Sequence, residues 1–281
     1  MRTRFAPSPT GYLHLGHAYS AMLAHDMADA AGGEFLLRIE DTDRARVRPE
    51  YEAAIHEDLR WLGLDWPEPV LRQSDHLDRY EAMLDRLAAM DLCYPCRCTR
   101  GDIRAALSAP QEGAGPDGPV YPGTCRARPM AERASGDAIR LDMTRALART
   151  GDVTRLTFRE TGPQHAGLQR LDPDRLLSEV GDVVLARRDI GAAAYHLAVV
   201  TDDALQGITH VIRGTDLFEA TFLHRLLQAL LGLPTPLYHH HRLIRDEHGK
   251  RLAKRDDARA IRTYRDAGAT PDDIRRMVGL V

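Results

Sequence analysis

Two histidines three residues apart, His14 and His17, stand at the start of a helix-forming segment, directly after a turn rich in proline and glycine. The first N–H groups of a helix have no partner within the helix and carry a partial positive charge, so this position suits a phosphate. The two imidazoles can add hydrogen bonds to phosphate oxygens, while Gly11 and Gly16 let the backbone approach a bulky anion. The spacing therefore predicts a site for a nucleoside triphosphate.

Three acidic side chains, Glu40, Asp41 and Asp43, follow the next apolar segment of the chain. Residues 3–5 and 35–39 are predicted as strands, and residues 15–31 as the helix between them, which together form a βαβ unit. Because such a crossover is right-handed, the turn before the helix lies at the carboxyl end of a parallel sheet, where open α/β sheets bind ligands. We expect the histidines and the acidic side chains to face one crevice.

These blocks resemble motifs of the glutamyl and glutaminyl branch of class I aminoacyl-tRNA synthetases. His14-Leu-Gly-His17 is similar to the nucleotide-binding HIGH element of that class. Arg4-Phe-Ala-Pro-Ser-Pro-Thr-Gly11 and Arg38-Ile-Glu-Asp-Thr-Asp43 resemble that branch in particular, and two separated blocks in order make the resemblance specific. It implies an α/β fold with a Rossmann catalytic domain that binds ATP through His14, Gly16 and His17.

The composition predicts a soluble enzyme of one large or two small domains. The 281 residues are 43% hydrophobic, which is enough for a substantial core. The net charge of −3 excludes a globally basic nucleic-acid binder, so we expect no DNA partner, and any RNA contact would depend on a local patch. The chain has no segment suited to span a membrane and no signal-peptide core, so a cytoplasmic location without a membrane partner is expected.

Four cysteines, Cys93, Cys96, Cys98 and Cys125, lie in one short region. This clustering is more typical of a metal site than of a disulfide framework, and zinc is the natural candidate. The loop that Cys125 closes is rich in glycine and proline and too poor in apolar residues to order itself, so zinc binding would supply the missing order. Spacing alone nominates Cys93 as the fourth ligand beside the other three.

The family resemblance nominates a different fourth ligand, Tyr121. Tyr121-Pro-Gly-Thr-Cys125 is similar to the YxxxC half of the zinc site in a truncated relative of the glutamyl synthetases. Cys93, in contrast, stands where a small structural residue is found in the glutamyl enzymes. A phenolate is an unusual zinc ligand, since cysteine, histidine and carboxylates dominate. Tyr121 is preferred, and Cys93 stays open as the alternative.

A third block, Ile208-Thr-His-Val-Ile-Arg-Gly-Thr-Asp216, resembles the THVIRGxD segment of the same enzymes. The resemblance implies that Arg213 and Tyr195 hold the amino acid, that Glu40 receives its amino group and that Arg4 faces its acidic side chain. Guanidinium groups suit this task because they bind a carboxylate through two parallel hydrogen bonds. The residues expected to contact glutamate are Arg4, Phe5, Ala6, Pro7, Ser8, Glu40, Tyr195 and Arg213. The alternative for Arg213 is a structural ion pair with Asp216 or Asp182.

Other segments are predicted as scaffold. A helix begins at Pro49, and apolar runs at 183–185 and 197–200 are predicted as strands. The adjacent pair Asp202 and Asp203 is predicted as a turn. His239-His-His241 is predicted as a strand entering a loop, because adjacent residues on an extended segment point to opposite faces and do not converge on a metal.

Near the end of the chain, Gly249-Lys-Arg-Leu-Ala-Lys-Arg255 resembles the GKKLSKR form of the class I KMSKS loop. Lys254 keeps the second lysine, whereas Arg251 and Ala253 replace the usual first lysine and serine. The resemblance implies that Lys254 closes on the triphosphate and joins His14 and His17 as a catalytic residue that compensates charge on the phosphate oxygens. Mg²⁺ is expected to accompany ATP.

We therefore predict a Rossmann catalytic domain in two halves, 1–95 and 128–240, separated by a zinc-binding insertion over 96–127. The KMSKS-like loop and short C-terminal helices occupy 241–281. Only about 25 residues follow that loop, enough for two short helices, whereas glutamyl-tRNA synthetases continue into a large helical anticodon-binding region.

This arrangement resembles a truncated branch of the family whose members activate glutamate without tRNA and attach it to the queuosine base in the anticodon of tRNA(Asp). The implied partners are glutamate, ATP and queuosine-bearing tRNA(Asp), with the wobble base splayed out as in most single-stranded RNA recognition. Three alternatives remain at this point. They are the catalytic core of a glutamyl-tRNA synthetase with its anticodon domain on another chain, a nucleotidylyltransferase of the wider HxGH superfamily, and a non-enzymatic zinc RNA-binding module.

Overall fold

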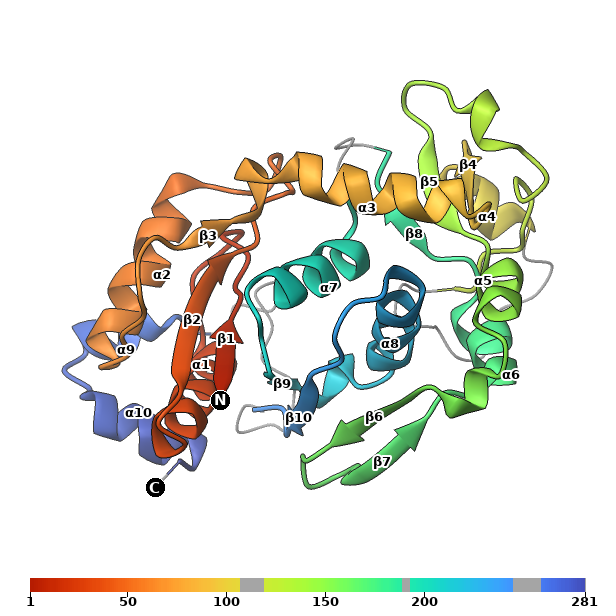
Figure 1. The fold of residues 1–281 in the computed structure, drawn as a ribbon. Coiled ribbons are helices and arrows are strands. Elements are labelled where there is room, and N and C mark those ends of the chain that lie inside the picture. The colour runs from red at the N-terminus through yellow and green to blue at the C-terminus, as the bar shows by residue number, and fades with distance from the viewer. Residues whose placement is uncertain (107–118, 189–192, 245–258, 281) are drawn as a thin grey trace.

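The first part of the chain forms the parallel βαβ unit that the sequence predicts. The computed structural model describes residues 1–106, 119–188, 193–244 and 259–280. Strand β1 (Arg2–Phe5) leads through helix α1 (Leu15–Ala30) to strand β2 (Glu34–Ile39), and β1 and β2 pair in parallel. The short strand β3 (Leu71–Arg72) extends this sheet beside β2. The carboxyl ends of β1 and β2 therefore lie side by side, as expected (Figure 1).

A second sheet lies against the edge of β1. Its strands, in spatial order, are β7 (Gly167–Arg170), β6 (Thr157–Glu160), β10 (Leu237–His241) and β9 (His210–Gly214). The pairs β6–β10 and β10–β9 are parallel, whereas β6 and β7 form an antiparallel hairpin. Just before β9, the Thr209 N–H donates to the Arg2 carbonyl oxygen at 3.0 Å, which joins the two sheets. The strand predicted at 239–241 is the end of β10, so this prediction is confirmed.

A third sheet stands at one end of the molecule and is antiparallel. It consists of β4 (Cys93–Cys96), β5 (Ala138–Leu141) and β8 (Val184–Ala186), with β5 in the middle. Helix α4 (Arg100–Ala106) follows β4 and lies beside this sheet (Figure 1). The segment 96–127 thus starts at the last residue of β4 and ends before β5.

Helices pack against the sheets and join them. The remaining α-helices are α2 (Pro49–Trp61), α3 (Leu77–Ala89), α5 (Met143–Thr150), α6 (Pro173–Arg175), α7 (Tyr195–Leu205), α8 (Ala220–Leu231), α9 (Ile261–Asp266) and α10 (Pro271–Val278). Short 3₁₀ or π turns occupy Gln73–Asp75, Met130–Glu132, Val153–Arg155, Leu176–Val180 and Thr215–Leu217. None of the helices within the described ranges combines the length and the apolar character needed to cross a bilayer.

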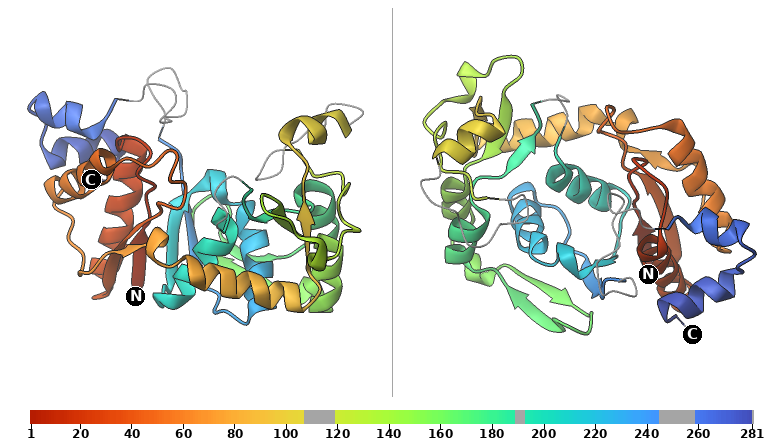
Figure 2. Two further views of the ribbon diagram at one scale, coloured as in Figure 1. Left: turned by 90° about the horizontal axis from the view of Figure 1, so that it is seen from above. Right: turned by 180° about the vertical axis from the view of Figure 1, so that it is seen from behind.

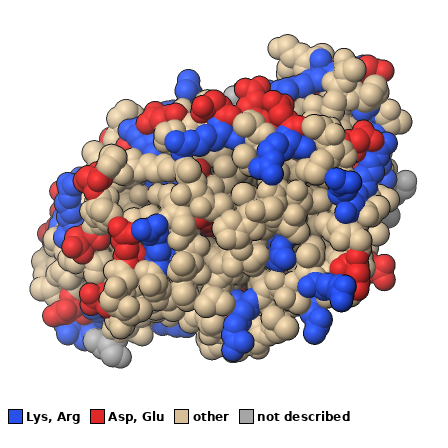
Figure 3. Space-filling view, viewed as in Figure 1, with Lys and Arg blue, Asp and Glu red and all other residues tan. Residues whose placement is uncertain are grey.

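The buried apolar side chains form two main cores. One lies between α1, α2 and the first sheet and includes Ile261 and Ile274 from the C-terminal helices. The other joins α3, α5, α7 and α8 to β5 and β6. Figure 2 shows the C-terminal helices beside the N-terminal segment, where Arg275 of α10 pairs with Asp26 of α1 at 2.7 Å. On the face shown in Figure 3, basic and acidic side chains are interspersed along the edge that α3 forms.

The prediction of a strand at 197–200 is wrong, because these residues lie within helix α7. Every residue from His196 to Asp203 is buried, so the segment lacks the alternation of apolar and polar faces that marks a helix at a protein surface. The predicted turn at Asp202 and Asp203 is wrong for the same reason. Both acidic residues lie inside α7 and are buried, which means that each needs a partner.

Candidate active site

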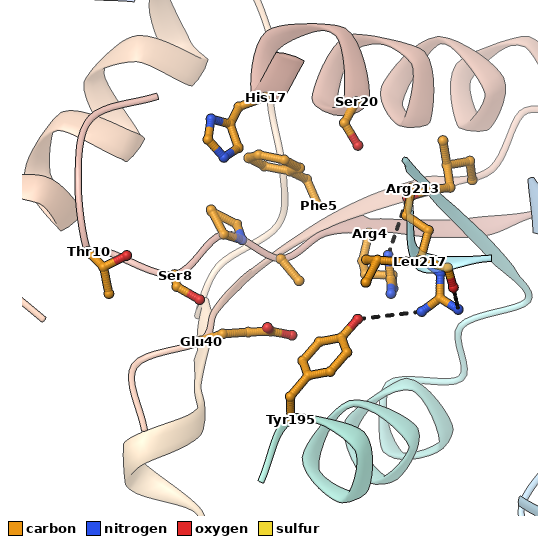
Figure 4. Close-up of a pocket in the computed structure, with 13 residues that line it drawn as sticks. Arg4, Phe5, Ser8, Thr10, His17, Ser20, Glu40, Tyr195, Arg213 and Leu217 are labelled. Atoms are coloured by element: carbon orange, nitrogen blue, oxygen red, sulfur yellow. Dashed lines mark hydrogen bonds between the residues drawn. The ribbon is translucent and has the colours of Figure 1, made fainter. Parts of the chain in front are cut away.

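A cavity of about 450 Å³ opens at the carboxyl ends of β1, β2 and β9, beside the start of α1 (Figure 4). Its walls come from segments far apart in the sequence. Among the residues that line it, those predicted from the sequence are Arg4, Phe5, Ala6, Pro7, Ser8, His17, Glu40, Tyr195 and Arg213. The structure thus brings together the whole predicted amino-acid set and one of the two histidines.

Four further lining residues, Thr10, Ser20, Ile212 and Leu217, were not predicted. Ser20 could have been found from helical periodicity, because it lies three residues after His17 on the same face of α1. Thr10 belongs to the proline-rich turn before α1. Ile212 and Leu217 flank Arg213 along β9 and the turn after it, where the chain passes the cavity.

His14 and His17 cap helix α1 reciprocally. The Gly16 N–H donates to Nδ1 of His14 and the His14 N–H donates to Nδ1 of His17, both at 3.1 Å. Since each Nδ1 accepts a hydrogen bond, the proton of each neutral ring sits on Nε2, which is then a donor. His17 lines the cavity, whereas His14 acts as the N-cap behind it. A Cβ at Gly16 would lie 3.0 Å from His14 Cε1, so glycine lets the first ring pack against the helix.

A buried charge network holds one side of the cavity. Asp203 Oδ1 accepts from Nε of Arg4 at 3.0 Å and from Nη1 of Arg38 at 2.8 Å, and Arg38 Nη2 also donates to Glu40 at 3.3 Å. Burial opposes ionisation of Asp203, but Arg4 and Arg38 hold its pKa below its usual range. Burial raises the pKa of Glu40, and an ammonium group placed against it would offset that cost. Sequence reasoning missed Asp203 and gave Arg38 no separate role.

Asp202, the other acidic residue of α7, points away from the cavity toward α3. Asp202 accepts from the Gln73 amide at 2.8 Å and from the Tyr80 hydroxyl at 3.0 Å. Its carboxylate also lies 3.8 Å from Nε of Arg38. Burial raises the pKa of Asp202, and these hydrogen bonds and the guanidinium oppose that rise. The two acids therefore fix α7 against both the first sheet and α3.

Arg213 reaches the cavity from β9 and lies 3.5 Å from the hydroxyl of Tyr195, the first residue of α7 (Figure 4). The alternative of a structural pair with Asp182 is not supported by the geometry. Asp182 accepts from the Tyr94 hydroxyl at 2.5 Å and from Nε of Arg126 at 2.8 Å, beside the third sheet.

A second, smaller cavity of about 190 Å³ adjoins the first and shares Ser8, Thr10, Glu40 and Tyr195 with it. Its other polar lining residues are Thr42, Asp43, Arg46, Gln73 and Arg187. Asp43 pairs with Nη1 of Arg187 at 3.2 Å, which ties the segment after β2 to the segment after β8. Glu40 and Asp43 thus face this crevice, as expected. Asp41 does not, because it is buried and accepts from the N–H of Ser74 at 2.8 Å and from its hydroxyl at 2.6 Å. The predicted Lys254, together with Arg251 and Ala253, lies outside the described residues.

The cysteine cluster lies at the far end of the molecule, beside the third sheet. The Sγ atoms of Cys96, Cys98 and Cys125 all lie within 4.8 Å of one another. The Tyr121 hydroxyl lies 3.4 Å from Sγ of both Cys96 and Cys98 and accepts from the Cys125 N–H at 2.9 Å. Cys93 packs instead in the large apolar core, where burial raises its thiol pKa to about 12. The structure thus places Tyr121, and not Cys93, with the three thiols.

Comparison with known proteins identifies a family that this chain matches. The family model of the catalytic domain of class I tRNA synthetases (E and Q) matches residues 1–281. A glutamyl-Q tRNA(Asp) synthetase of Rhodobacter capsulatus is 61% identical and is covered over its full length, as is this chain. The protein of the same name from Symbiobacterium thermophilum is 42% identical, with 96% of this chain and 83% of the relative covered.

The solved structures give the same result for the fold. The crystal structure of a glutamate tRNA ligase from Elizabethkingia meningosepticum, in complex with its amino acid, matches 91% of this chain with a TM-score of 0.69 and 29% identity. This chain spans about half of that ligase, 52% of its length. The match over the whole chain and the identity to full-length relatives lead to one conclusion: this chain belongs to the class I tRNA synthetases of the glutamyl and glutaminyl type.

Proposed function

We propose that this chain activates glutamate with ATP and transfers the glutamyl group to the queuosine base in the anticodon of tRNA(Asp). The observation that carries the proposal is the cavity in which Arg4, Glu40 and Arg213 meet beside His17 at the start of α1. The choice of acceptor is supported by the name of the relative that is 61% identical over the whole chain. An enzyme with these substrates works in the cytoplasm.

The cavity offers complementary charges for each group of glutamate. Arg213 and Tyr195 would hold the amino acid, Glu40 would receive its ammonium group, and Arg4 would face its side-chain carboxylate. The two carboxylates and the ammonium lose hydration on entering the cavity, and the fixed opposite charges offset this loss. The segment from Phe5 to Ser8 lines the cavity and would contact the amino acid along this wall.

Adenylate formation needs positioning and charge compensation rather than a covalent enzyme intermediate. An oxygen of the glutamate carboxylate attacks the α-phosphorus of ATP, and the bond to the bridging oxygen breaks as pyrophosphate leaves. Mg²⁺ enters with ATP, bound to its phosphate oxygens. The N–H groups of α1 and the Nε2–H of His17 would donate to those oxygens, His14 and Gly16 would shape the helix start, and Lys254 would add its charge.

In the second step a hydroxyl of the queuosine cyclopentene ring attacks the carbonyl carbon of the adenylate. AMP leaves, the hydroxyl proton is released and an ester forms. We place this acceptor in the smaller cavity, because that cavity shares Glu40 and Tyr195 with the glutamate site and is lined by polar groups. The charged pair Asp43 and Arg187 at its wall can form hydrogen bonds with hydroxyl groups of a nucleoside.

Transfer of radiolabelled glutamate tests the proposal directly. We expect ATP-dependent label on tRNA(Asp) that contains queuosine, and background label on tRNA(Asp) without queuosine and on tRNA(Glu). Label on tRNA(Glu) but not on queuosine-containing tRNA(Asp) would contradict the proposed acceptor.

The second candidate is a glutamyl-tRNA synthetase core. It is favoured by one observation, the structural match to glutamate tRNA ligases at a TM-score of 0.69. It predicts the same activation of glutamate but transfer to the terminal ribose of tRNA(Glu). The tRNA(Glu) arm of the same assay separates the two candidates.

We further propose that the cysteine cluster holds one structural zinc ion through Cys96, Cys98, Tyr121 and Cys125. Tetrahedral zinc with Zn–S bonds of about 2.3 Å places its sulfur ligands about 3.8 Å apart. Sγ of Cys98 lies 3.6 Å from Sγ of Cys125, and the Tyr121 oxygen lies 3.4 Å from two sulfurs. This spacing fits the four ligands. When bound, zinc would cross-link segments around 96–98 and 121–125 and supply stability rather than chemistry.

Single substitutions distinguish the two candidates for the fourth ligand. We expect Tyr121→Phe to weaken zinc binding by at least about tenfold, because it removes one donor atom from the first coordination sphere. Cys93→Ser should keep one zinc ion per chain, since Cys93 packs in the apolar core. Metal analysis after dialysis against a graded series of chelator concentrations measures both. Full zinc retention in Tyr121→Phe together with loss in Cys93→Ser would assign Cys93 as the ligand.

A further inference from the structure

The Arg213 guanidinium is held from behind by side chains that do not line the cavity. Its Nε–H donates to Nε2 of His240 at 3.0 Å, and its Nη2 donates to Oγ1 of Thr221 at 2.7 Å. Its Nη1 lies 3.2 Å from Nδ1 of His224. All three partners are buried. These short contacts fix the plane of the guanidinium before any ligand binds.

The contacts of Arg213 on the cavity side are longer. Nη1 lies 3.5 Å from the Tyr195 hydroxyl, and Nη2 lies 3.3 Å from the Leu217 carbonyl oxygen. Long hydrogen bonds are weak, so an incoming carboxylate can replace these two at small cost. The five N–H donors of arginine are therefore divided between a fixed rear edge and an exchangeable front edge.

The chemistry of arginine fixes the protonation of His240. A guanidinium has donors only, so Nε2 of His240 must accept and carries no proton. The proton of the neutral ring then sits on Nδ1, which donates to Oε2 of Glu160 at 2.5 Å. Burial lowers the pKa of His240 to about 4, in keeping with a neutral ring at physiological pH. The tautomer follows from the two partners and not from the pKa.

Glu160, the last residue of β6, is built into this position by its backbone surroundings. Its Oε1 accepts from the His240 N–H at 2.9 Å and from the Gly162 N–H at 2.6 Å. A Cβ at Gly162 would lie 2.2 Å from the His240 carbonyl oxygen, so only glycine permits the approach. Burial opposes ionisation, but hydrogen bonds from His240 and Gly162 keep the Glu160 pKa below its usual range. The carboxylate thus accepts at both oxygens.

We infer that Glu160 and His240 are positioning residues for Arg213. The Glu160 carboxylate selects the His240 tautomer, and the accepting Nε2 orients the guanidinium so that its front edge faces the amino acid. Neither residue lines the cavity, so both act through Arg213. This inference rests on the proposed function, because that proposal assigns Arg213 to glutamate.

We call the chain of contacts from Glu160 through His240 to Arg213 the relay. Glu160→Gln tests it with almost no change in side-chain shape. The amide has one acceptor oxygen where three donors converge, so its NH₂ group must face either the two backbone N–H groups or Nδ1 of His240. In the second case the ring accepts at Nδ1 and carries its proton on Nε2, where it opposes the Arg213 Nε–H. We expect the KM for glutamate to rise about tenfold, with the KM for ATP and kcat nearly unchanged, in glutamate-dependent ATP–pyrophosphate exchange.

Variants of His240 supply the second measurement. His240→Gln can accept from Arg213 and donate to Glu160, so its KM for glutamate should stay near the wild-type value. His240→Leu cannot accept, so its KM for glutamate should rise as in Glu160→Gln. Glu81→Gln, on the exposed face of α3, is the matched control for the glutamate substitution.

The outcomes separate the relay from a structural role and from the proposed function. If a substitution only destabilised the fold, fewer molecules would be active, so the apparent kcat would fall and the KM for glutamate would not change. That result would overturn the relay. Equal KM values for His240→Gln and His240→Leu would overturn it as well. Thermal unfolding followed by circular dichroism verifies that each variant is folded. If the wild-type protein showed no glutamate-dependent exchange, the proposed function would fail, whatever the variants did.

Discussion

Replacing His17 by alanine should slow glutamyl-adenylate formation by about 10²-fold, the usual loss when one donor to a developing negative charge is removed. His17 lines the main cavity at the first turn of α1, and its Nδ1 accepts from the His14 N–H at 3.1 Å. The ring is therefore held with Nε2–H as its donor toward the phosphate region. Glutamate-dependent exchange of radiolabelled pyrophosphate into ATP measures the loss.

The same residue also caps the helix, so a second variant separates the two roles. A glutamate at the third position of a helix accepts from the N-cap N–H in the capping box, so His17→Glu keeps the cap. Its carboxylate cannot donate and would repel the triphosphate, so exchange should fall at least as far as in His17→Ala. His25→Ala, in the same helix but paired with Asp65, should retain wild-type exchange. Near wild-type exchange in His17→Glu would show that capping is the only role of His17.

The first βαβ unit could be predicted from sequence because its signals are local. The short apolar run of residues 35–37 lies in β2, and the glycine-containing turn before α1 places His17 at the end of the sheet. The residues predicted to bind glutamate come from separate motifs. They share one cavity because β1 pairs with β2 and the segment that leads into β9 bonds to β1. The family resemblance predicts what each of these residues does, and the arrangement of the strands explains why the residues lie together.

The parts that sequence reasoning missed depend on contacts between distant segments. Asp203 pairs with Arg4 and Arg38, which lie more than 160 positions earlier in the chain, and neither spacing nor periodicity reports such a pairing. Helix α7 was mistaken for a strand because burial on all sides removes the periodic signal. Spacing also favoured Cys93, whereas the antiparallel pairing of β4 with β5 directs it into the apolar core.

Replacing Asp203 by asparagine should destabilise the fold by about 3 kcal/mol, because it leaves two buried guanidinium groups without the carboxylate that they share. Arg38 is fully buried and Arg4 nearly so, and Asp203 lies within 3.0 Å of both. For a chain of this size the change corresponds to a fall in Tm of roughly 5 °C. Chemical denaturation gives the free energy of unfolding, and differential scanning calorimetry gives the shift in Tm.

The pH dependence of the stability difference between wild type and Asp203→Asn shows whether the Asp203 charge causes that difference. Burial opposes ionisation of Asp203, but Arg4 and Arg38 lower its pKa in the folded state, so its stabilisation is present above about pH 4 and is lost as the pH falls through the folded pKa. Asparagine does not titrate, so the difference in the free energy of unfolding between wild type and variant should decrease on acidification. Glu34→Gln, which breaks an exposed pair with Arg2, should cost at most about 1 kcal/mol. Two results would show that the charge network does not stabilise the cavity wall. One is a loss of unfolding free energy in Asp203→Asn no larger than that in Glu34→Gln, and the other is a loss that stays constant in acid.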